Sequence, residues 1–136
     1  MVFAIKAALD DPTAALFVFD AQKTMYGGKS IAAGDTIFVF ASENEGGRGL
    51  VARGVVVAAE PTPRRLGPAR QTPRVGITVR PTAFAKQPLG RADLRPFAQW
   101  DDGQAQTELN FKFYRQATDK IVAISDTAAA FLDTRF

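Results

Sequence analysis

The chain has 136 residues, 46% of them apolar and 23% charged, which is the composition of one globular domain able to bury its own core. It contains no cysteine and no histidine, so structural zinc sites and Cys–His or Ser–His nucleophile systems are excluded. The formal net charge is +3, but residues 48–95 hold ten basic and only two acidic residues, which gives this segment a net charge of +8. Such a concentration of positive charge predicts a surface that attracts polyanions.

The first half of the chain predicts strands. Residues 2–9 are an apolar run with one lysine, as in a buried strand. Residues 13–22 begin with Ala-Ala-Leu, which suits a helix, and continue with Phe-Val-Phe, which suits a strand, so both interpretations stay open. Residues 36–42 and 50–60 are rich in β-branched and aromatic residues on either side of a glycine-rich loop, which predicts a hairpin, with Gly54 marking either a bulge or a close backbone approach.

The second half mixes loops with short elements. Residues 61–73 contain four prolines and three arginines, which predicts a basic surface loop, and residues 75–81 predict another strand. Residues 82–103 are loop-like with one helical turn near Arg91. The alternation of Leu109, Phe111 and Phe113 predicts a half-buried strand over residues 108–114. A short strand at 121–124 and a helix capped by Ser125 complete the chain.

These elements predict an α+β fold, with residues 1–136 forming a single domain. Five to six strands close into a small mixed β pseudo-barrel with short flanking helices. The N-terminus lacks the pattern of a signal peptide, and no apolar run approaches the ~20 residues that span a bilayer. We therefore expect a cytoplasmic protein without a membrane partner. Nothing in the residue spacing calls for a metal or a cofactor.

Three segments resemble the PUA-like superfamily, and within it the EVE domain most. The opening Phe3-Ala4-Ile5-Lys6 is similar to the first strand of that family, which reads aromatic, any residue, hydrophobic, Lys. Residues 34–42 (GDTIFVFAS) and 49–56 (GLVARGVV) are similar to its signature hairpin. Arg115-Gln116, a short strand and the Ser125-led helix are similar to its closing segment. The region between Asp10 and Ile31 departs from the family pattern.

The resemblance implies a pseudo-barrel with a pocket for a nucleobase, which is modified in some members, or for structured RNA. An extruded base stacks on aromatic rings, polar groups read its edge, and Arg or Lys side chains hold the flanking phosphates. We therefore expect a non-catalytic nucleic-acid-binding module, with DNA and RNA both open. The candidate ligand-binding residues are Lys6, Phe40, Ser42, Asn44, Trp100, Arg115 and Gln116, and the candidate backbone contacts are Arg64, Arg65, Arg70 and Arg74.

Two alternatives of other classes stay open. Some PUA-like relatives with Lys, Thr and Glu in the pocket resemble amidohydrolases acting on nucleosides, and Lys23-Thr24 with Glu43 or Glu45 would supply the same residue types. The other alternative is a protein-interaction or oligomerising domain, such as a homodimer, in which the Pro/Arg loop contacts an acidic partner. Positive charge alone does not separate this alternative from nucleic-acid binding, because a cationic surface attracts any polyanion.

Overall fold

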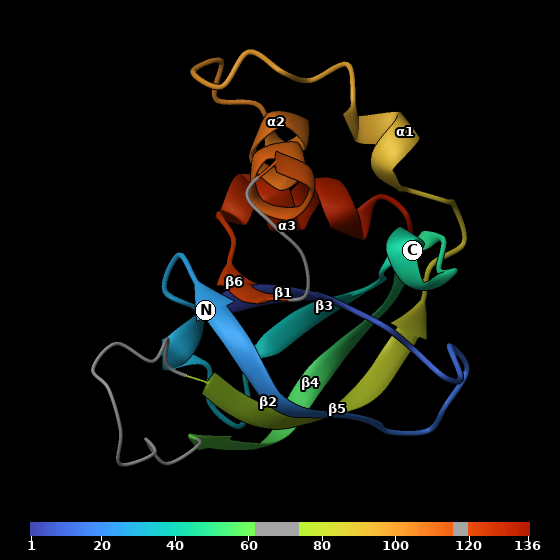
Figure 1. The fold of residues 1–136 in the computed structure, drawn as a ribbon, viewed down its shortest axis with the longest axis vertical. Helices are drawn as coiled ribbons and strands as arrows, with labels where there is room; N and C mark the ends of the chain where they lie inside the picture. The colour runs from blue at the N-terminus through green and yellow to red at the C-terminus, as the bar shows by residue number, and fades with distance from the viewer. Residues whose placement is uncertain (62–73, 116–119) are drawn as a thin grey trace.

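The computed structural model describes residues 1–61, 74–115 and 120–136, and this part of the chain forms a six-stranded barrel beside a layer of helices (Figure 1). The strands are β1 (Val2–Ala7), β2 (Phe17–Met25), β3 (Thr36–Ala41), β4 (Gly49–Pro61), β5 (Arg74–Phe84) and β6 (Lys120–Ala123). The helices are α1 (Arg91–Leu94), α2 (Ala105–Asn110) and α3 (Asp126–Asp133), with short 3-10 helices η1 (Gly28–Ser30) and η2 (Glu43–Glu45) and a π-helix η3 (Phe111–Arg115).

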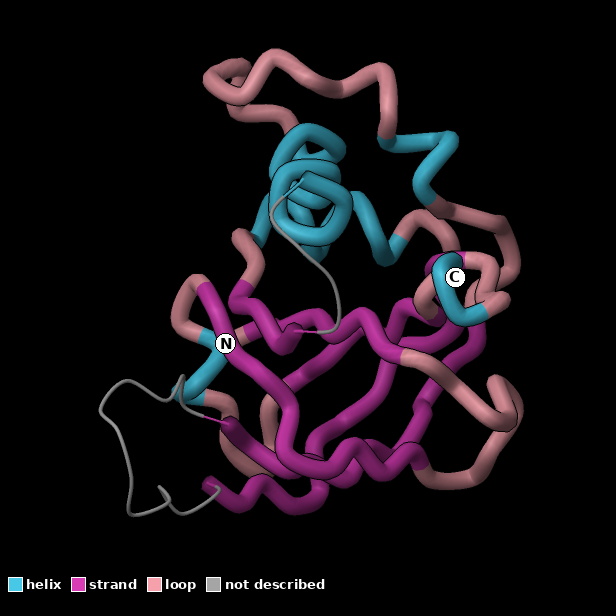
Figure 2. The backbone as a smooth tube through the Cα atoms, in the orientation of Figure 1, coloured by secondary structure: helices cyan, strands magenta, loops and turns pink. Residues whose placement is uncertain are grey.

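The barrel is closed in the order β1-β3-β4-β5-β2-β6. The β1–β3 and β2–β6 pairs are parallel, and the other four pairs are antiparallel. The barrel closes because β6 lies between β1 and β2 and pairs with both strands. Figure 2 shows the larger helices gathered on one side of this barrel.

Two apolar cores follow from the alternation of side chains along the strands. Phe3, Ile5 and Val39 belong to one buried cluster, which fills the barrel. Ala4 and Phe40 point the opposite way and belong to a second cluster with Leu109 of α2 and Leu132 of α3. The outer face of β1 and β3 is therefore buried under the helices, and side chains on that face lie between the barrel and the helical layer.

Most of the predicted elements are confirmed. The hairpin is β3 and β4, the register of β4 against β5 shifts at Gly54, and α1 occupies the predicted helical turn. Ser125 is the N-cap of α3, where its side chain accepts a hydrogen bond from Ala128 N. Of the open segment 13–22, residues 17–22 belong to β2, in which buried Phe17 and Phe19 alternate with exposed Val18 and Asp20, and residues 13–16 lie before the strand.

The predicted strand at 108–114 is wrong. These residues form the end of α2 and the π-helix η3. Leu109 and Phe113 are both fully buried and lie four residues apart, which places them on one side of a helix. Phe111, between them, is only half-buried, so the period-two pattern was coincidental.

The predicted basic loop lies mostly outside the described residues, together with Arg64, Arg65, Arg70 and Gln116. Arg74 is described and is exposed at the start of β5. Within the described ranges, no helix is long and apolar enough to cross a membrane.

Candidate functional site

Lys6 is a charged residue inside the interface between barrel and helices. Its side chain has no exposed surface, and its Nζ donates a hydrogen bond of 2.6 Å to the carbonyl oxygen of Phe113 in η3. The same Nζ lies 4.3 Å from the centroid of the Tyr114 ring. Because an ammonium group loses its hydration on burial, such a residue is costly unless its surroundings compensate. The predicted buried lysine thus joins the first strand to the π-helix.

Ser42 follows β3 at the same edge of the interface. Lys6 is the register partner of Phe40, and Ser42 N donates a 2.8 Å hydrogen bond to Ala7 O, so Ser42 lies two positions beyond the Lys6–Phe40 pair. Only 1% of Ser42 is exposed. Its Oγ has no hydrogen-bond partner among the described residues. A buried hydroxyl without a partner costs free energy that a bound polar group would recover.

Glu43 connects three segments beside these two residues. Its Oε1 accepts hydrogen bonds from Tyr114 Oη at 2.6 Å and from Arg91 N at 3.0 Å. Arg91 also reaches the Asn44 side-chain oxygen at 3.2 Å and lies 5.4 Å from the Tyr114 ring. Burial raises the pKa of the Tyr114 phenol well above its usual range, and the hydrogen bond to Glu43 raises it further. The phenol therefore stays protonated at neutral pH.

Trp100 and Arg115 lie against one another on the helical side. The Arg115 guanidinium is 5.1 Å from the Trp100 ring, which packs on Phe111 at 5.4 Å, and Phe111 packs on Tyr26 at 6.2 Å. We call Trp100, Phe111 and Tyr26 the aromatic row. Trp100 is 41% exposed and Tyr26 is 39% exposed. Both ends of the row thus present ring surface to solvent.

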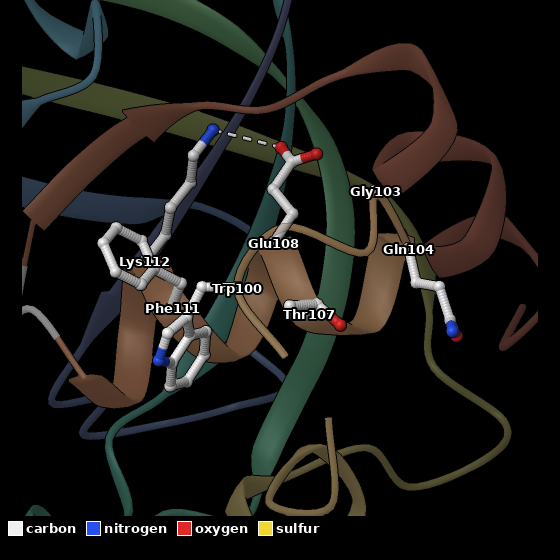
Figure 3. Close-up of a pocket in the computed structure, with 7 residues that line it drawn as sticks. All are labelled: Trp100, Gly103, Gln104, Thr107, Glu108, Phe111 and Lys112. Atoms are coloured by element: carbon white, nitrogen blue, oxygen red, sulfur yellow. Dashed lines mark hydrogen bonds and ion pairs between the residues drawn. The ribbon is translucent and has the colours of Figure 1, made fainter. Parts of the chain in front are cut away.

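A cavity of about 230 Å³ opens beside Trp100 and Phe111 (Figure 3). Gln104, Thr107 and Lys112 contribute to its wall. Aromatic surface beside hydrogen-bonding groups is the combination that a planar, polar-edged ligand requires.

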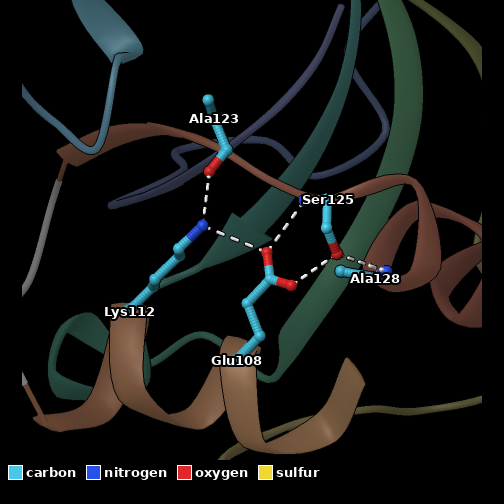
Figure 4. Close-up of polar contacts among 5 residues, drawn as sticks. All are labelled: Glu108, Lys112, Ala123, Ser125 and Ala128. Atoms are coloured by element: carbon cyan, nitrogen blue, oxygen red, sulfur yellow. Dashed lines mark hydrogen bonds and ion pairs between the residues drawn. The ribbon is translucent and has the colours of Figure 1, made fainter. Parts of the chain in front are cut away.

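The Glu108 carboxylate ties α2 to the segment between β6 and α3 (Figure 4). It accepts hydrogen bonds from Ser125 N at 2.8 Å, from Ser125 Oγ and from Lys112 Nζ at 3.0 Å. Lys112 Nζ donates in turn to Ala123 O at 2.7 Å. Burial acts to raise the pKa of Glu108, but the hydrogen bonds from Ser125 and Lys112 outweigh it and hold the pKa below its usual value of 4.5.

The Glu108→Gln variant should be less stable than the wild type at neutral pH and should approach it in acid. A lowered pKa in the folded state stabilises the fold above pH 4.5, and this contribution disappears as the pH falls through the folded-state value. We expect a loss of about 1–3 kcal/mol at pH 7, typical of hydrogen bonds to a charged group. Urea unfolding at neutral and acidic pH measures it. An equal loss at both pH values would contradict the role given to the carboxylate.

Of the predicted site residues, Lys6 lies against the Tyr114 ring, and Asn44 is bonded to Arg91, which lies against the same ring. Arg115 is the next residue along η3 and lies against Trp100. Phe40 has no exposed surface and stacks on Phe113 at a centroid distance of 5.0 Å, so its position is that of a core residue. Gln116 lies outside the described residues.

Tyr114, Arg91 and the role of Glu43 were not predicted. Glu43 and Tyr114 are 71 positions apart, and no local pattern links them. Of the alternative enzyme set, Glu43 is bound to Tyr114 and Arg91, Lys23 is exposed and Thr24 is buried on β2. Across the described residues, no group of three or more acidic side chains is placed to hold a metal ion.

No protein-family model matches the chain, and no curated protein matches it in sequence. Solved structures do match it. The human THYN1 protein, solved in complex with DNA containing 5-methylcytosine, has a TM-score of 0.67 at 15% identity, over 98% of this chain and 96% of that chain.

Two further structures agree. The DUF55 domain of human thymocyte nuclear protein 1 has a TM-score of 0.67 at 14% identity, over 99% of this chain and 98% of that one. A protein from Pseudomonas syringae has a TM-score of 0.60 at 15% identity, with both chains fully covered. Identities this low show the fold alone. With its closed mixed barrel and helical layer, the chain has the PUA-like fold of the EVE-domain type.

Proposed function

We propose that this domain binds nucleic acid without catalysis and holds one unpaired base where β1 and β3 meet the helices. The observation that carries this proposal is that two buried polar residues, Lys6 and Ser42, lie at one edge of that interface, and that the Ser42 hydroxyl has no hydrogen-bond partner among the described residues. Together they offer a positive hydrogen-bond donor and a hydroxyl that donates or accepts, which suits the polar edge of a base.

Residues of the helical side and the rim would supply the other parts of such a site. Trp100 presents an exposed ring on which a base stacks, and Arg115 beside it places positive charge where a neighbouring phosphate would lie. Asn44, held by Arg91, adds an amide at the rim. The complex of the structurally similar human THYN1 protein with 5-methylcytosine-containing DNA supports a DNA ligand and makes methylated cytosine the first modified base to test.

Fluorescence anisotropy with labelled single- and double-stranded DNA and RNA, from low to physiological salt, tests this proposal. We expect the logarithm of the affinity to fall linearly with the logarithm of the salt concentration. DNA with cytosine and with 5-methylcytosine should be compared directly. The absence of binding to every strand type at low salt would refute the proposal.

Trp100→Ala tests the stacking part. Loss of one base–aromatic stack costs about 1–3 kcal/mol, so we expect the affinity to fall about 5- to 150-fold. Phe84→Ala is the matched control, because Phe84 is 44% exposed and lies at the end of β5. If both variants weaken binding equally, Trp100 has no special role.

A further inference from the structure

Three basic residues stand side by side on three adjacent strands. In the β2–β6 pair Lys23 is the register partner of Lys120, and in the β2–β5 pair Lys23 is the register partner of Arg74. Register partners on neighbouring strands project from the same face of a sheet. We call Lys120, Lys23 and Arg74 the cationic rung.

The rung lies on the outside of the barrel. Lys23 and Arg74 are exposed and Lys120 is half-buried, whereas the residues that follow them on β2, β5 and β6, namely Thr24, Val75 and Ile121, are buried. With strands about 4.8 Å apart, three adjacent strands place these charges across roughly 10 Å of surface.

Like charges directly opposite one another destabilise a sheet. Here no acidic side chain relieves the repulsion, since none of the three forms an ion pair with any described residue. Arg74 donates a side-chain hydrogen bond of 3.3 Å to the backbone oxygen of Ala21. The repulsion among the three cations costs the folded protein free energy. A bound anion would remove that cost, so the rung fits a surface that receives an anion.

The rung is connected to the candidate base site by the chain itself. β2 ends at Met25, two residues after Lys23, and the next residue, Tyr26, begins the aromatic row that runs through Phe111 to Trp100, which Arg115 contacts. On the other side, β6 pairs with β1 up to Ile5 and Ile121, so the next residues in this register are Lys6 and Lys120. The rung therefore lies close along the chain to the exposed ring of Tyr26 and next in register to Lys6, which is buried.

We propose that the cationic rung binds the phosphodiester backbone of the strand whose base enters the site at Lys6 and Ser42. This inference rests on the proposed function and adds to it a second contact, outside the base site, made by Lys120, Lys23 and Arg74. The occupant is a single strand, because its successive bases are free to stack on the exposed rings of the aromatic row, whereas a duplex would have to extrude each base first.

The test compares two triple variants of equal charge. The rung variant is Lys23→Gln, Arg74→Gln and Lys120→Gln, and the control is Arg80→Gln, Lys86→Gln and Arg95→Gln, three exposed cations elsewhere. Each variant changes the net charge from +3 to 0. Binding of a labelled single-stranded DNA of mixed sequence is measured over a salt series.

We expect the rung variant to reduce the slope of log affinity against log salt by about 2, at ~0.7 for each phosphate contact with a single strand, and the control to leave it near the wild-type value. At low salt the rung variant should unfold at or above the wild-type temperature, since repulsion is removed. Equal slopes in the two triple variants, or a rung variant that unfolds several degrees earlier, would overturn the inference.

The outcomes separate the two proposals. A flattened slope in the rung variant, with Trp100→Ala binding as the wild type, supports the rung and refutes the stacking site. Loss of affinity in Trp100→Ala, with equal slopes in both triple variants, refutes the rung and supports the base site. A wild-type protein that binds no strand at low salt refutes both.

Discussion

Replacing Lys6 by methionine is expected to weaken nucleic-acid binding by at least about 30-fold while leaving the domain folded. The proposed ligand loses a buried positive donor, and losing one partner of a buried, charged hydrogen bond costs about 2–5 kcal/mol. The effect on stability should be smaller, because two opposing contributions change together. Phe113 O loses the 2.6 Å hydrogen bond, but the cost of keeping an ammonium group out of water also disappears.

Anisotropy and thermal unfolding of the same sample separate these effects. Lys86→Met is the control, since it makes the same chemical change at an exposed lysine. If Lys6→Met binds as tightly as Lys86→Met, then Lys6 serves only to anchor η3, and the base site must lie elsewhere.

Gly49→Ala is expected to destabilise the domain by about 3 kcal/mol and to disrupt the site at the same time. Gly49 has a φ of +87°, and a Cβ at this position would lie 2.1 Å from Leu89 O and 2.8 Å from Gly90 Cα. Both obstacles are backbone atoms, so relief requires the 89–91 segment to move. That movement would break the Leu50 N–Leu89 O hydrogen bond and draw Arg91 away from Glu43.

Gly46→Ala provides the comparison, because Gly46 has a φ of +84° with nothing within 4 Å of the added Cβ. It should lose only the roughly 1 kcal/mol associated with a left-handed backbone. Urea unfolding of both variants therefore isolates the close approach of the two segments. If both variants lose the same free energy of unfolding, the 89–91 segment moves away from the added Cβ without a cost in stability.

The success of the sequence prediction depended on how local each signal was. The β3–β4 hairpin was predicted correctly because β-branched and aromatic residues on both strands flank glycines, two of which, Gly46 and Gly49, adopt positive φ. Ser125 was recognised as a cap because its hydrogen bond reaches only three residues ahead.

The failure at 108–114 has an equally specific cause. If Leu109, Phe111 and Phe113 all face the core, their spacing fits a strand. If only Leu109 and Phe113 face the core, their spacing fits a helix. Phe111 packs on Trp100 and Tyr26 at the surface, a tertiary contact that the local sequence does not encode. The site shows the same limit, because Lys6 was predicted from the cost of burying a charge, whereas its neighbour Tyr114 was not.

The position of β6 in the closed barrel has a consequence for how the chain folds. Residues 120–123 are made last among the strands, yet they separate β1 from β2, which are made first. On the ribosome, the facing edges of these two early strands therefore stay unpaired until nearly the whole chain has emerged. Exposed edges of this kind recruit other chains, and contacts distant in sequence form slowly. Premature termination before Lys120 would leave a product prone to aggregate.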